Sequence, residues 1–187
     1  SMDSGNFAWS IAATALVLFM TPGVAFFYGG LVKAKSVVSM MMMSFGAMGL
    51  ISVLWILYGF NMSLGGGSLA FAGNPFGPEG QNFALANLDS ATLIGAAFGA
   101  TFAIITVALI SGAIADRAKF GSWLIFAGLW ATIVYFPVAA WVWGDGWLQK
   151  RGLMDFAGGT VVHINAGVAA LVCALVLGRR RGFPETA

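Results

Sequence analysis

The sequence predicts an all-α integral membrane protein with five transmembrane helices, and three observations support this fold class. Hydrophobic residues make up 59% of the 187 residues and charged residues only 9%, whereas soluble domains carry about 25% charged residues. Five apolar runs each approach or exceed the roughly 20 residues that a helix needs to cross a bilayer. These runs are long and continuous, unlike the short alternating segments of a spanning β-barrel.

The five expected helices follow one another with short polar connections and a single long one. From the apolar runs, we expect them over residues 7–31, 37–62, 92–115, 120–143 and 160–178. The first contains Thr21-Pro22-Gly23. A proline inside a helix removes one backbone hydrogen bond and predicts a kink. That kink is either a packing feature or a bend that shapes a cavity.

The second expected helix and the connection after it carry less information about chemistry. The run Met40 to Met43 suits a lipid-facing surface or irregular packing, because methionine is adaptable. The connection 63–89 is longer than most loops and rich in Gly, Asn and Pro, so it is either a functional lid or a flexible excursion. Asn61-Met62-Ser63 matches a glycosylation acceptor, but its place beside the membrane gives the match no weight.

Aromatic residues mark the third and fourth expected helices. Phe98 and Phe102 are four residues apart and therefore share one helix face. Such a pair is either a core or lipid contact, or a gate. The fourth helix ends in Trp141-Val-Trp143-Gly-Asp145-Gly-Trp147. These indoles form either an ordinary belt at the membrane interface or a surface that captures a cation, an attraction of roughly 0.5 to 2 kcal/mol.

The fifth expected helix holds the only histidine of the chain, His163, in an apolar stretch. An ionisable group at membrane depth is costly and indicates a functional site. If the segment is helical from Asp155, the eight residues to His163 span about 12 Å. Asp155 or Thr160 is expected to cap this helix, with attraction of cations as the other role of Asp155. Gly158-Gly159 would allow another helix to approach closely. His163 is expected in a permeation pathway, exchanging a proton or making one hydrogen bond while neutral.

The basic residues predict the orientation in the membrane. Seven of the nine follow the first, third and fifth expected helices, and only Lys150 and Arg151 lie on the other side. The positive-inside rule then places the N-terminus outside and the C-terminus in the cytoplasm. The net charge of +2 therefore reflects topology and gives no reason to expect nucleic acid.

Several function classes are disfavoured by the residues that the chain contains. One histidine, no nucleophile constellation and no metal-ligand cluster argue against an enzyme, a metal site or a cofactor. Cys173 is alone in the fifth helix and is expected to be a small buried hydrophobe.

Taken together, several motifs closely resemble the ammonium transporter family, Amt/Mep/Rh, from about residue 6 to residue 183. They are Phe26-Phe27-Tyr28-Gly29-Gly30-Leu31, Ala113-Ile-Ala-Asp116-Arg117, Trp143-Gly144 and Asp155-Phe-Ala-Gly-Gly-Thr-Val-Val-His163-Ile-Asn165.

The resemblance assigns a role to each candidate residue. It implies that Trp143 recruits ammonium at the outer mouth, and that Phe98 and Phe102 lie near the outer gate. Asp155 corresponds to an acidic residue needed for cation recruitment and helix stability. His163 corresponds to the first of two histidines in tandem along a hydrophobic pore. Gly99 departs from the family, since some members carry a polar side chain there, so hydrogen bonding at the mouth is expected to differ.

The resemblance also implies a larger protein. Family members have about eleven spans in two five-helix halves related as an inverted repeat, and this chain corresponds to the first half. We expect residues 1–183 to form that transmembrane half and 184–187 a cytoplasmic tail or the start of a linker. The chain is then expected to be a fragment, without the partner histidine, the second gate phenylalanine and the serine of the outer site. A face that includes His163 would be exposed, and the basic bias argues against an inverted second copy as its cover.

The function implied is transport of ammonium or ammonia through a hydrophobic pore in the cell membrane, with activity that requires the second half. A homotrimer in the lipid bilayer and a PII-type regulator on the cytoplasmic face are the implied partners. Two other functions stay open: an ammonium-sensing membrane receptor and a transport-inactive structural fragment.

Overall fold

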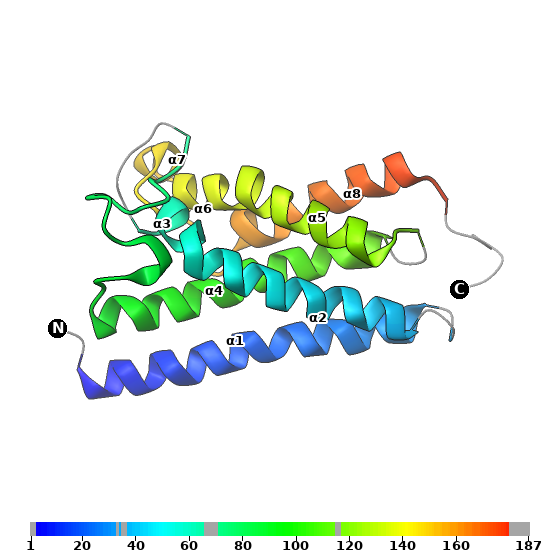
Figure 1. The fold of residues 1–187 in the computed structure, drawn as a ribbon, viewed down its shortest axis with the longest axis horizontal. Coiled ribbons are helices and arrows are strands. Elements are labelled where there is room, and N and C mark those ends of the chain that lie inside the picture. The colour runs from blue at the N-terminus through cyan, green and yellow to red at the C-terminus, as the bar shows by residue number, and fades with distance from the viewer. Residues whose placement is uncertain (1–2, 33, 35–36, 66–70, 115–116, 180–187) are drawn as a thin grey trace.

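Five helical spans run along one long axis and form the whole of the described architecture (Figure 1). The computed structural model describes residues 3–32, 34, 37–65, 71–114 and 117–179. The spans that are long and apolar enough to cross a membrane are Ser4–Leu31, Val37–Ser63, Ser90–Ile114, Phe120–Lys150 and Gly159–Leu177. All five expected helices are confirmed, with ends that differ by a few residues. The expected end of the third at residue 115 and the tail 184–187 lie outside the described residues.

The first span is the single helix α1 (Ser4–Leu31). Its N-cap is Asp3, whose carboxylate accepts from the backbone N–H of Asn6 at 2.7 Å. The helix continues through Pro22, so the proline does not break it. Its surface is mostly exposed, with Phe19 and Phe26 among the most exposed side chains. An apolar helix of this kind suits a lipid environment.

The second and third spans pack closely against each other. The second consists of α2 (Val37–Leu54), the π-helical η2 (Trp55–Gly59) and α3 (Phe60–Ser63). The third consists of α4 (Ser90–Ser111), capped by Asp89, and the 3-10 turn η4 (Gly112–Ile114). Met40 and Met43 are buried while Met42 is half exposed. Met40 and Met43 therefore fit the expected packing role, and Met42 fits the expected lipid-facing role.

The fourth and fifth spans carry the other two π-helical segments. The fourth runs through α5 (Phe120–Trp130), η5 (Ala131–Tyr135), α6 (Phe136–Trp143) and the short α7 (Trp147–Lys150). The fifth runs through η6 (Gly159–Ile164) and α8 (Asn165–Leu177). Nothing in the apolar pattern predicted a π-helix, because widening one turn by a single residue leaves a run of apolar residues unchanged. Segments of this kind often lie at functional sites.

The core lies around α4, which packs against α1, α2 and α8. More of α4 is buried than of any other span, whereas α1 and the fifth span are the least buried. Large buried side chains from the second and fourth spans fill the space beside α4, among them Trp55, Trp123, Tyr135 and Phe136. Cys173 is only partly buried, so the expectation of a buried residue is met in part.

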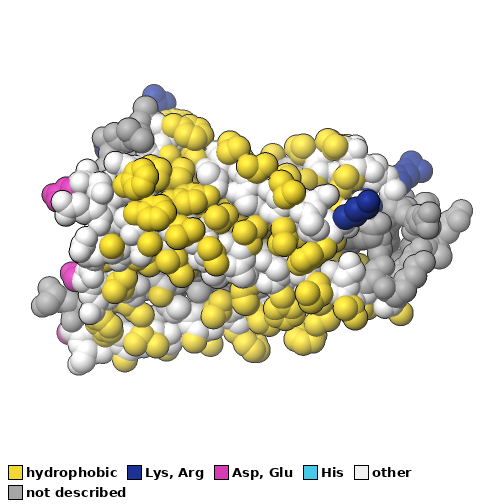
Figure 2. All heavy atoms as spheres, in the orientation of Figure 1, with side chains coloured by type: hydrophobic (Ala, Val, Ile, Leu, Met, Phe, Trp, Pro, Cys, Tyr) yellow, Lys and Arg dark blue, Asp and Glu magenta, His cyan; other side chains and the backbone are white. Residues whose placement is uncertain are grey.

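The two ends of the bundle differ in charge, and we name them accordingly (Figure 2). The acidic end is where α1 and α4 begin and where α7 lies (Figure 1). The described acidic residues belong to segments at this end: Asp3, Glu79, Asp89, Asp145 and Asp155. Lys150 and Arg151 are the described basic residues beside them. The basic end carries Arg117, Lys119 and Arg179 among the described residues.

The described part of the long connection is folded against the helices at the acidic end. The Asn61 amide nitrogen donates to the carbonyls of Pro75 and Asn82 at 3.0 and 2.8 Å. The Trp141 indole donates to the carbonyl of Phe71 at 2.7 Å. The connection includes the 3-10 turn η3 (Phe83–Leu85). Residues 71–89 are therefore a structured cover rather than a flexible excursion. Because Asn61 is 1% exposed, its amide is not accessible for glycosylation in this fold.

Gly59 provides a test of the packing between the second and fourth spans. A Cβ at Gly59 would lie 2.5 to 2.9 Å from the ring of Phe136, and that ring is enclosed by Trp55, Tyr58 and Tyr135. We expect Gly59→Ala to lower stability by roughly 1 to 3 kcal/mol through overpacking. Thermal unfolding in detergent would measure this loss.

The matched control is Gly49→Ala in the same span, where an added Cβ meets nothing within 4 Å. That variant should be neutral or slightly stabilising, because alanine favours helix more than glycine does. Equal effects of the two substitutions would contradict the packing argument.

Candidate functional site

Three aromatic rings from two helices form one cluster at the acidic end. Phe98 and Phe102 of α4 make an edge-to-face pair with ring centroids 5.0 Å apart. Phe102 makes a second edge-to-face contact with Trp143, the last residue of α6, at 5.7 Å. Aromatic pairs favour this geometry because the positive edge of one ring meets the negative face of the other. The structure thus brings together three residues that were separate candidates in the sequence. We call Phe98, Phe102 and Trp143 the aromatic trio.

The orientation of Trp143 is fixed by a hydrogen bond to the segment before the fifth span. Its indole N–H donates to the backbone carbonyl of Asp155 at 2.7 Å. α6 ends at Trp143, and the residue that follows must be a glycine because a Cβ at Gly144 would collide with the carbonyl oxygen of Ser63. With the N–H occupied, only the π-surface of this partly exposed indole is left to interact with a ligand. A π-surface attracts cations.

Asp155 caps the fifth span with both carboxylate oxygens. One oxygen accepts from the backbone N–H groups of Gly158 and Gly159 at 2.7 and 2.8 Å. The other accepts from Thr160 and Val161 at 2.9 and 3.0 Å. These are backbone donors that a helix start leaves without partners. The expected capping role is confirmed, whereas the condition that the segment is helical from Asp155 is not met. The helix begins at Gly159, so the expected 12 Å of helical rise to His163 does not apply.

The same contacts change the acidity of Asp155. Partial burial opposes ionisation, but the four N–H donors outweigh it and hold the pKa of this carboxyl below its ordinary value. The carboxylate is therefore ionised at neutral pH, in the residue whose carbonyl accepts the indole N–H of Trp143. Asp155 has two connected functions in this structure, because its side chain caps the fifth span while its carbonyl holds Trp143.

Gly158 is needed for the turn into the fifth span. Its φ of +94° lies in the left-handed region, and an added Cβ would lie 2.7 Å from Val162 of the same helix. An added Cβ at Gly159 would meet only the Asp155 carboxylate, at 3.9 Å. Among the described residues, no other helix uses these glycines for close approach. The expectation of a helix contact at Gly158-Gly159 stays a prediction.

His163 lies within η6, which packs against α4 and α6, the helices that carry the aromatic trio. Its backbone N–H donates to the carbonyl of Gly158 at 2.9 Å, a bond to the fifth residue back. The side chain is exposed, on a span that continues with exposed Ile164, Val168 and Leu171. The expected exposure of His163 on an uncovered face is confirmed. Figure 1 shows that α8 begins nearer the middle of the long axis than α1 or α4 do.

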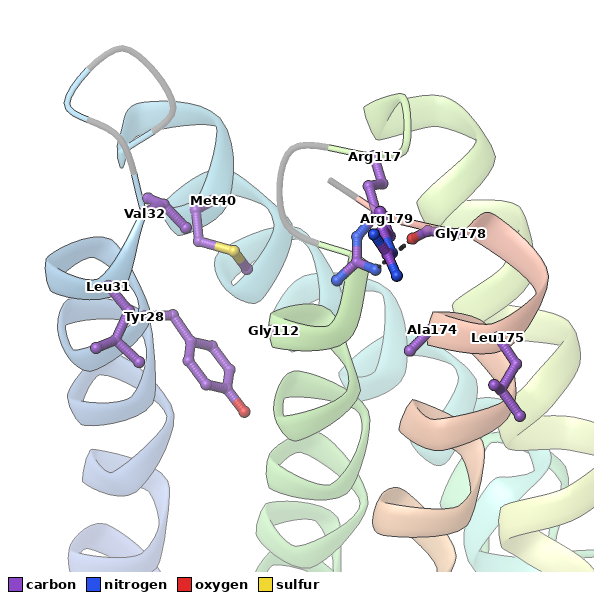
Figure 3. Close-up of a pocket in the computed structure, with 10 residues that line it drawn as sticks. All are labelled: Tyr28, Leu31, Val32, Met40, Gly112, Arg117, Ala174, Leu175, Gly178 and Arg179. Atoms are coloured by element: carbon purple, nitrogen blue, oxygen red, sulfur yellow. Dashed lines mark hydrogen bonds between the residues drawn. The ribbon is translucent and has the colours of Figure 1, made fainter. Parts of the chain in front are cut away.

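A cavity of about 590 Å³ lies at the basic end, between α1, α4 and α8 (Figure 3). The Tyr28 side chain enters it and donates a hydrogen bond from its hydroxyl to the carbonyl of Leu109 at 2.7 Å. Its ring occupies the space that a side chain at Gly112 would need. Arg117 donates to the carbonyl of Gly178 at 2.8 Å and closes the rim. The sequence pattern does not single out Tyr28 by itself, because a tyrosine in an apolar helix carries no spacing signal.

The described residues include no group of three or more His, Cys, Asp or Glu side chains placed to hold a metal ion. The site is instead apolar and aromatic, with one ionised carboxylate beside it. Such a site can attract a small cation and replace part of its water with π-surface. It has no constellation for nucleophilic or acid–base chemistry on a substrate.

Comparison with known proteins supplies independent information. Residues 8–187 match the Ammonium Transporter Family. An ammonium transporter of Mycobacterium tuberculosis is 53% identical over 98% of this chain and 44% of its own length. Among solved structures, Mep2 of Candida albicans is 34% identical, with a TM-score of 0.86 over 96% of this chain and 40% of its own. A protein described as "Sensor Amt Protein" is 26% identical, with a TM-score of 0.82 over 92% of this chain. The chain spans less than half the length of these relatives.

The cap at Asp155 predicts a pH dependence of stability. An amide oxygen accepts fewer hydrogen bonds than a carboxylate, so Asp155→Asn should lose about 1 kcal/mol at neutral pH. A lowered pKa means that the stabilisation is complete above the ordinary carboxyl pKa of 3.8. It is lost as pH falls through the lower value in the folded state. Thermal unfolding of both proteins in detergent from neutral pH to about pH 3 would measure the difference.

The control is Asp145→Asn, at an exposed residue of the same end. This substitution should change stability little at any pH in the range. A difference between wild type and Asp155→Asn that persists unchanged at the lowest pH would argue against the ionised cap.

Proposed function

Because this chain belongs to the ammonium transporter family, we propose that it forms part of a pathway that carries ammonium or ammonia across a membrane. The single observation that supports this most is the aromatic trio, held beside the ionised carboxylate of Asp155 at one end of a five-span membrane fold. Family membership places the chain among transporters rather than enzymes. Ammonium is the substrate that this proposal assigns to the chain itself.

Recruitment of NH4+ is proposed at the acidic end. Five described acidic residues and two basic residues belong to this end, so its formal charge is 2 − 5 = −3. A negative mouth concentrates cations near the pathway. Trp143 then binds the cation over its π-surface, which contributes roughly 0.5 to 2 kcal/mol depending on how far the site is dehydrated. Asp155 contributes longer-range attraction and holds the indole in place through its carbonyl.

The contact between Phe98 and Phe102 serves as the outer gate in this proposal. Both rings are partly exposed and close-packed, so a hydrated ion has little space to pass between them. Beyond the trio the pathway continues along an apolar surface toward His163. Na+ and K+ are excluded, because nothing on such a surface replaces their water of hydration.

His163 marks the hydrophobic part of the pathway, and the proposal requires a cover for the face that carries it. An exposed imidazole on an apolar helix is unfavourable in lipid. The relatives are more than twice as long as this chain, and we propose that the matching remainder covers this face. A second histidine, the second gate phenylalanine and the serine of the outer site would come from that remainder. Activity of this chain by itself is then not expected.

We also propose the orientation and partners that follow from this assignment. The acidic end faces outward, and the basic end faces the cytoplasm of a cell membrane, in accord with the positive-inside rule. The assembly is a homotrimer, with a PII-type regulator at the cytoplasmic face. Lys33, Lys35, Arg180 and Arg181, which contribute to the basic bias, lie outside the described residues.

A receptor that senses ammonium is the second candidate, favoured by the similarity to the protein described as a sensor. The two functions share a recruitment site and differ in flux. A sensor would bind ammonium at the aromatic trio without net movement across the membrane. A transport-inactive fragment would do neither.

Substitution of Trp143 separates these functions. Trp143→Leu keeps an apolar side chain but removes both the π-surface and the indole donor. In the full-length gene product reconstituted in liposomes, we expect its KM for ammonium to rise roughly fivefold or more. The measurement is internal pH or current after an ammonium jump. Loss of ligand binding in a protein that never shows flux would support the sensor. Unchanged flux would contradict the recruitment site.

Substitution of His163 tests the pathway beyond the gate. His163→Ala in the same liposome assay should change the rate or the charge movement of transport while leaving ammonium binding at the outer mouth in place, because His163 belongs to η6 and is not a member of the aromatic trio. The 187-residue chain, assayed separately, should give no signal above empty liposomes. A saturable signal from it that His163→Ala alters would show that the chain forms its own pore.

A further inference from the structure

Trp55 contacts both helices that carry the aromatic trio. It is the first residue of η2 and is 2% exposed. Its indole N–H donates to the backbone carbonyl of Ala96 in α4 at 2.9 Å. Ala96 is two residues before Phe98, so this bond joins the second span to the turn of α4 that starts the gate.

The ring of Trp55 also rests on the backbone of α4 at Gly99. A Cβ at Gly99 would lie 2.9 Å from the six-membered ring of Trp55 and 2.8 Å from Leu64. Gly99 therefore faces Trp55 rather than the mouth, and the absence of a side chain is what lets the indole lie against the helix. The departure from the family at this position is explained by packing with Trp55 in this chain.

The opposite side of Trp55 contacts the helix that ends in Trp143. Its ring makes an edge-to-face contact with Phe136, the first residue of α6, at 5.9 Å. Phe136 is fully buried and also contacts Tyr58 and Tyr135. Because α6 is a continuous helix from Phe136 to Trp143, the position of Phe136 determines the position of Trp143.

The π-helical segments support this arrangement. The backbone N–H of Phe60 donates to the carbonyl of Trp55, five residues back, which widens the turn at this point. The hydroxyls of Tyr58 in η2 and Thr132 in η5 are 2.7 Å apart and join the two widened segments. Thr132 donates to the carbonyl of Gly128 at 2.9 Å, so Tyr58 is the donor of this pair. The second and fourth spans are thus fixed to each other beside Trp55.

From these contacts we propose that Trp55 is a positioning residue that sets the separation between Phe102 and Trp143. This inference deepens the proposed function and rests on it. Trp55 does not meet the substrate. It holds α4 by a hydrogen bond and α6 by ring packing, so that the rings of the aromatic trio stay at the distance that a small cation requires. Trp55→Phe would remove the donor and reduce the ring, and the trio would lose its fixed spacing.

The chain offers a matched control in Trp123. This tryptophan is 1% exposed, and its indole N–H donates to a backbone carbonyl at the same distance, 2.9 Å, that of Met43 in α2. It joins α5 to α2 and has no contact with the trio among the described aromatic pairs. Trp123→Phe therefore makes the same chemical change in an equally buried place. Both substitutions should lower thermal stability to a similar extent.

The experiment compares the two variants in the full-length gene product with ammonium as the probe. We expect Trp55→Phe to raise the KM for ammonium roughly fivefold, the scale of one weakened cation–π contact, with the maximal rate within about twofold of wild type. Trp123→Phe should leave KM unchanged. Equal KM values for the two variants would overturn the proposal. If Trp55 were only structural, its substitution would change the KM for ammonium no more than that of Trp123 does.

Hydrogen–deuterium exchange provides a readout that does not depend on transport. Trp55→Phe should raise exchange in the peptide covering residues 94–103, and Trp123→Phe should not. If wild type shows no saturable ammonium flux, the proposed function fails, and the exchange comparison still decides whether Trp55 holds α4. No increase in exchange at this peptide would overturn the positioning role even if transport is present.

Discussion

The carboxylate of Asp155 is the interaction on which the candidate site depends. It satisfies the first N–H groups of the fifth span, which otherwise would face an apolar environment without partners. The same residue accepts the Trp143 indole on its carbonyl. One residue thus fixes the start of the helix that carries His163 and the ring that closes the aromatic trio. Its ionised state couples the geometry of the mouth to pH.

Four tryptophans of the described fold make the same kind of hydrogen bond. Trp55, Trp123, Trp141 and Trp143 each donate an indole N–H to a backbone carbonyl of another element. A helix carbonyl has a second lone pair, so it can accept the indole without giving up its place in the helix. Two of these bonds, from the buried Trp55 and Trp123, join one helix to another while their rings fill the core. The other two, from Trp141 and Trp143, fix loop segments at the acidic end. Where such a tryptophan joins the two helices of a site, as Trp55 does, we propose that it also sets the spacing of the rings that meet the ligand.

Two spans of the described fold have apolar surfaces that no other described helix covers. The fifth span and α1 present apolar side chains around nearly their whole circumference, as lipid or a partner helix requires. His163 on that surface needs a partner group, because an imidazole in hydrocarbon is costly. The relatives are more than twice as long, and their length is enough for a second set of spans. The completed pathway would then lie between two surfaces, of which this chain supplies one.

The sequence by itself determined the class, the five spans and most of the candidate residues, because long apolar runs and an intramembrane histidine are local features. Phe98 and Phe102 could be paired from their spacing, since a helix places residues four apart on one face. Only the tertiary structure brought Trp143 to Phe102 and the carbonyl of Asp155 to the indole, because those contacts join different spans. The π-helical segments and the role of Gly99 were also decided there. A widened turn leaves no trace in hydropathy, and a glycine shows its purpose only when the ring that rests on it is known.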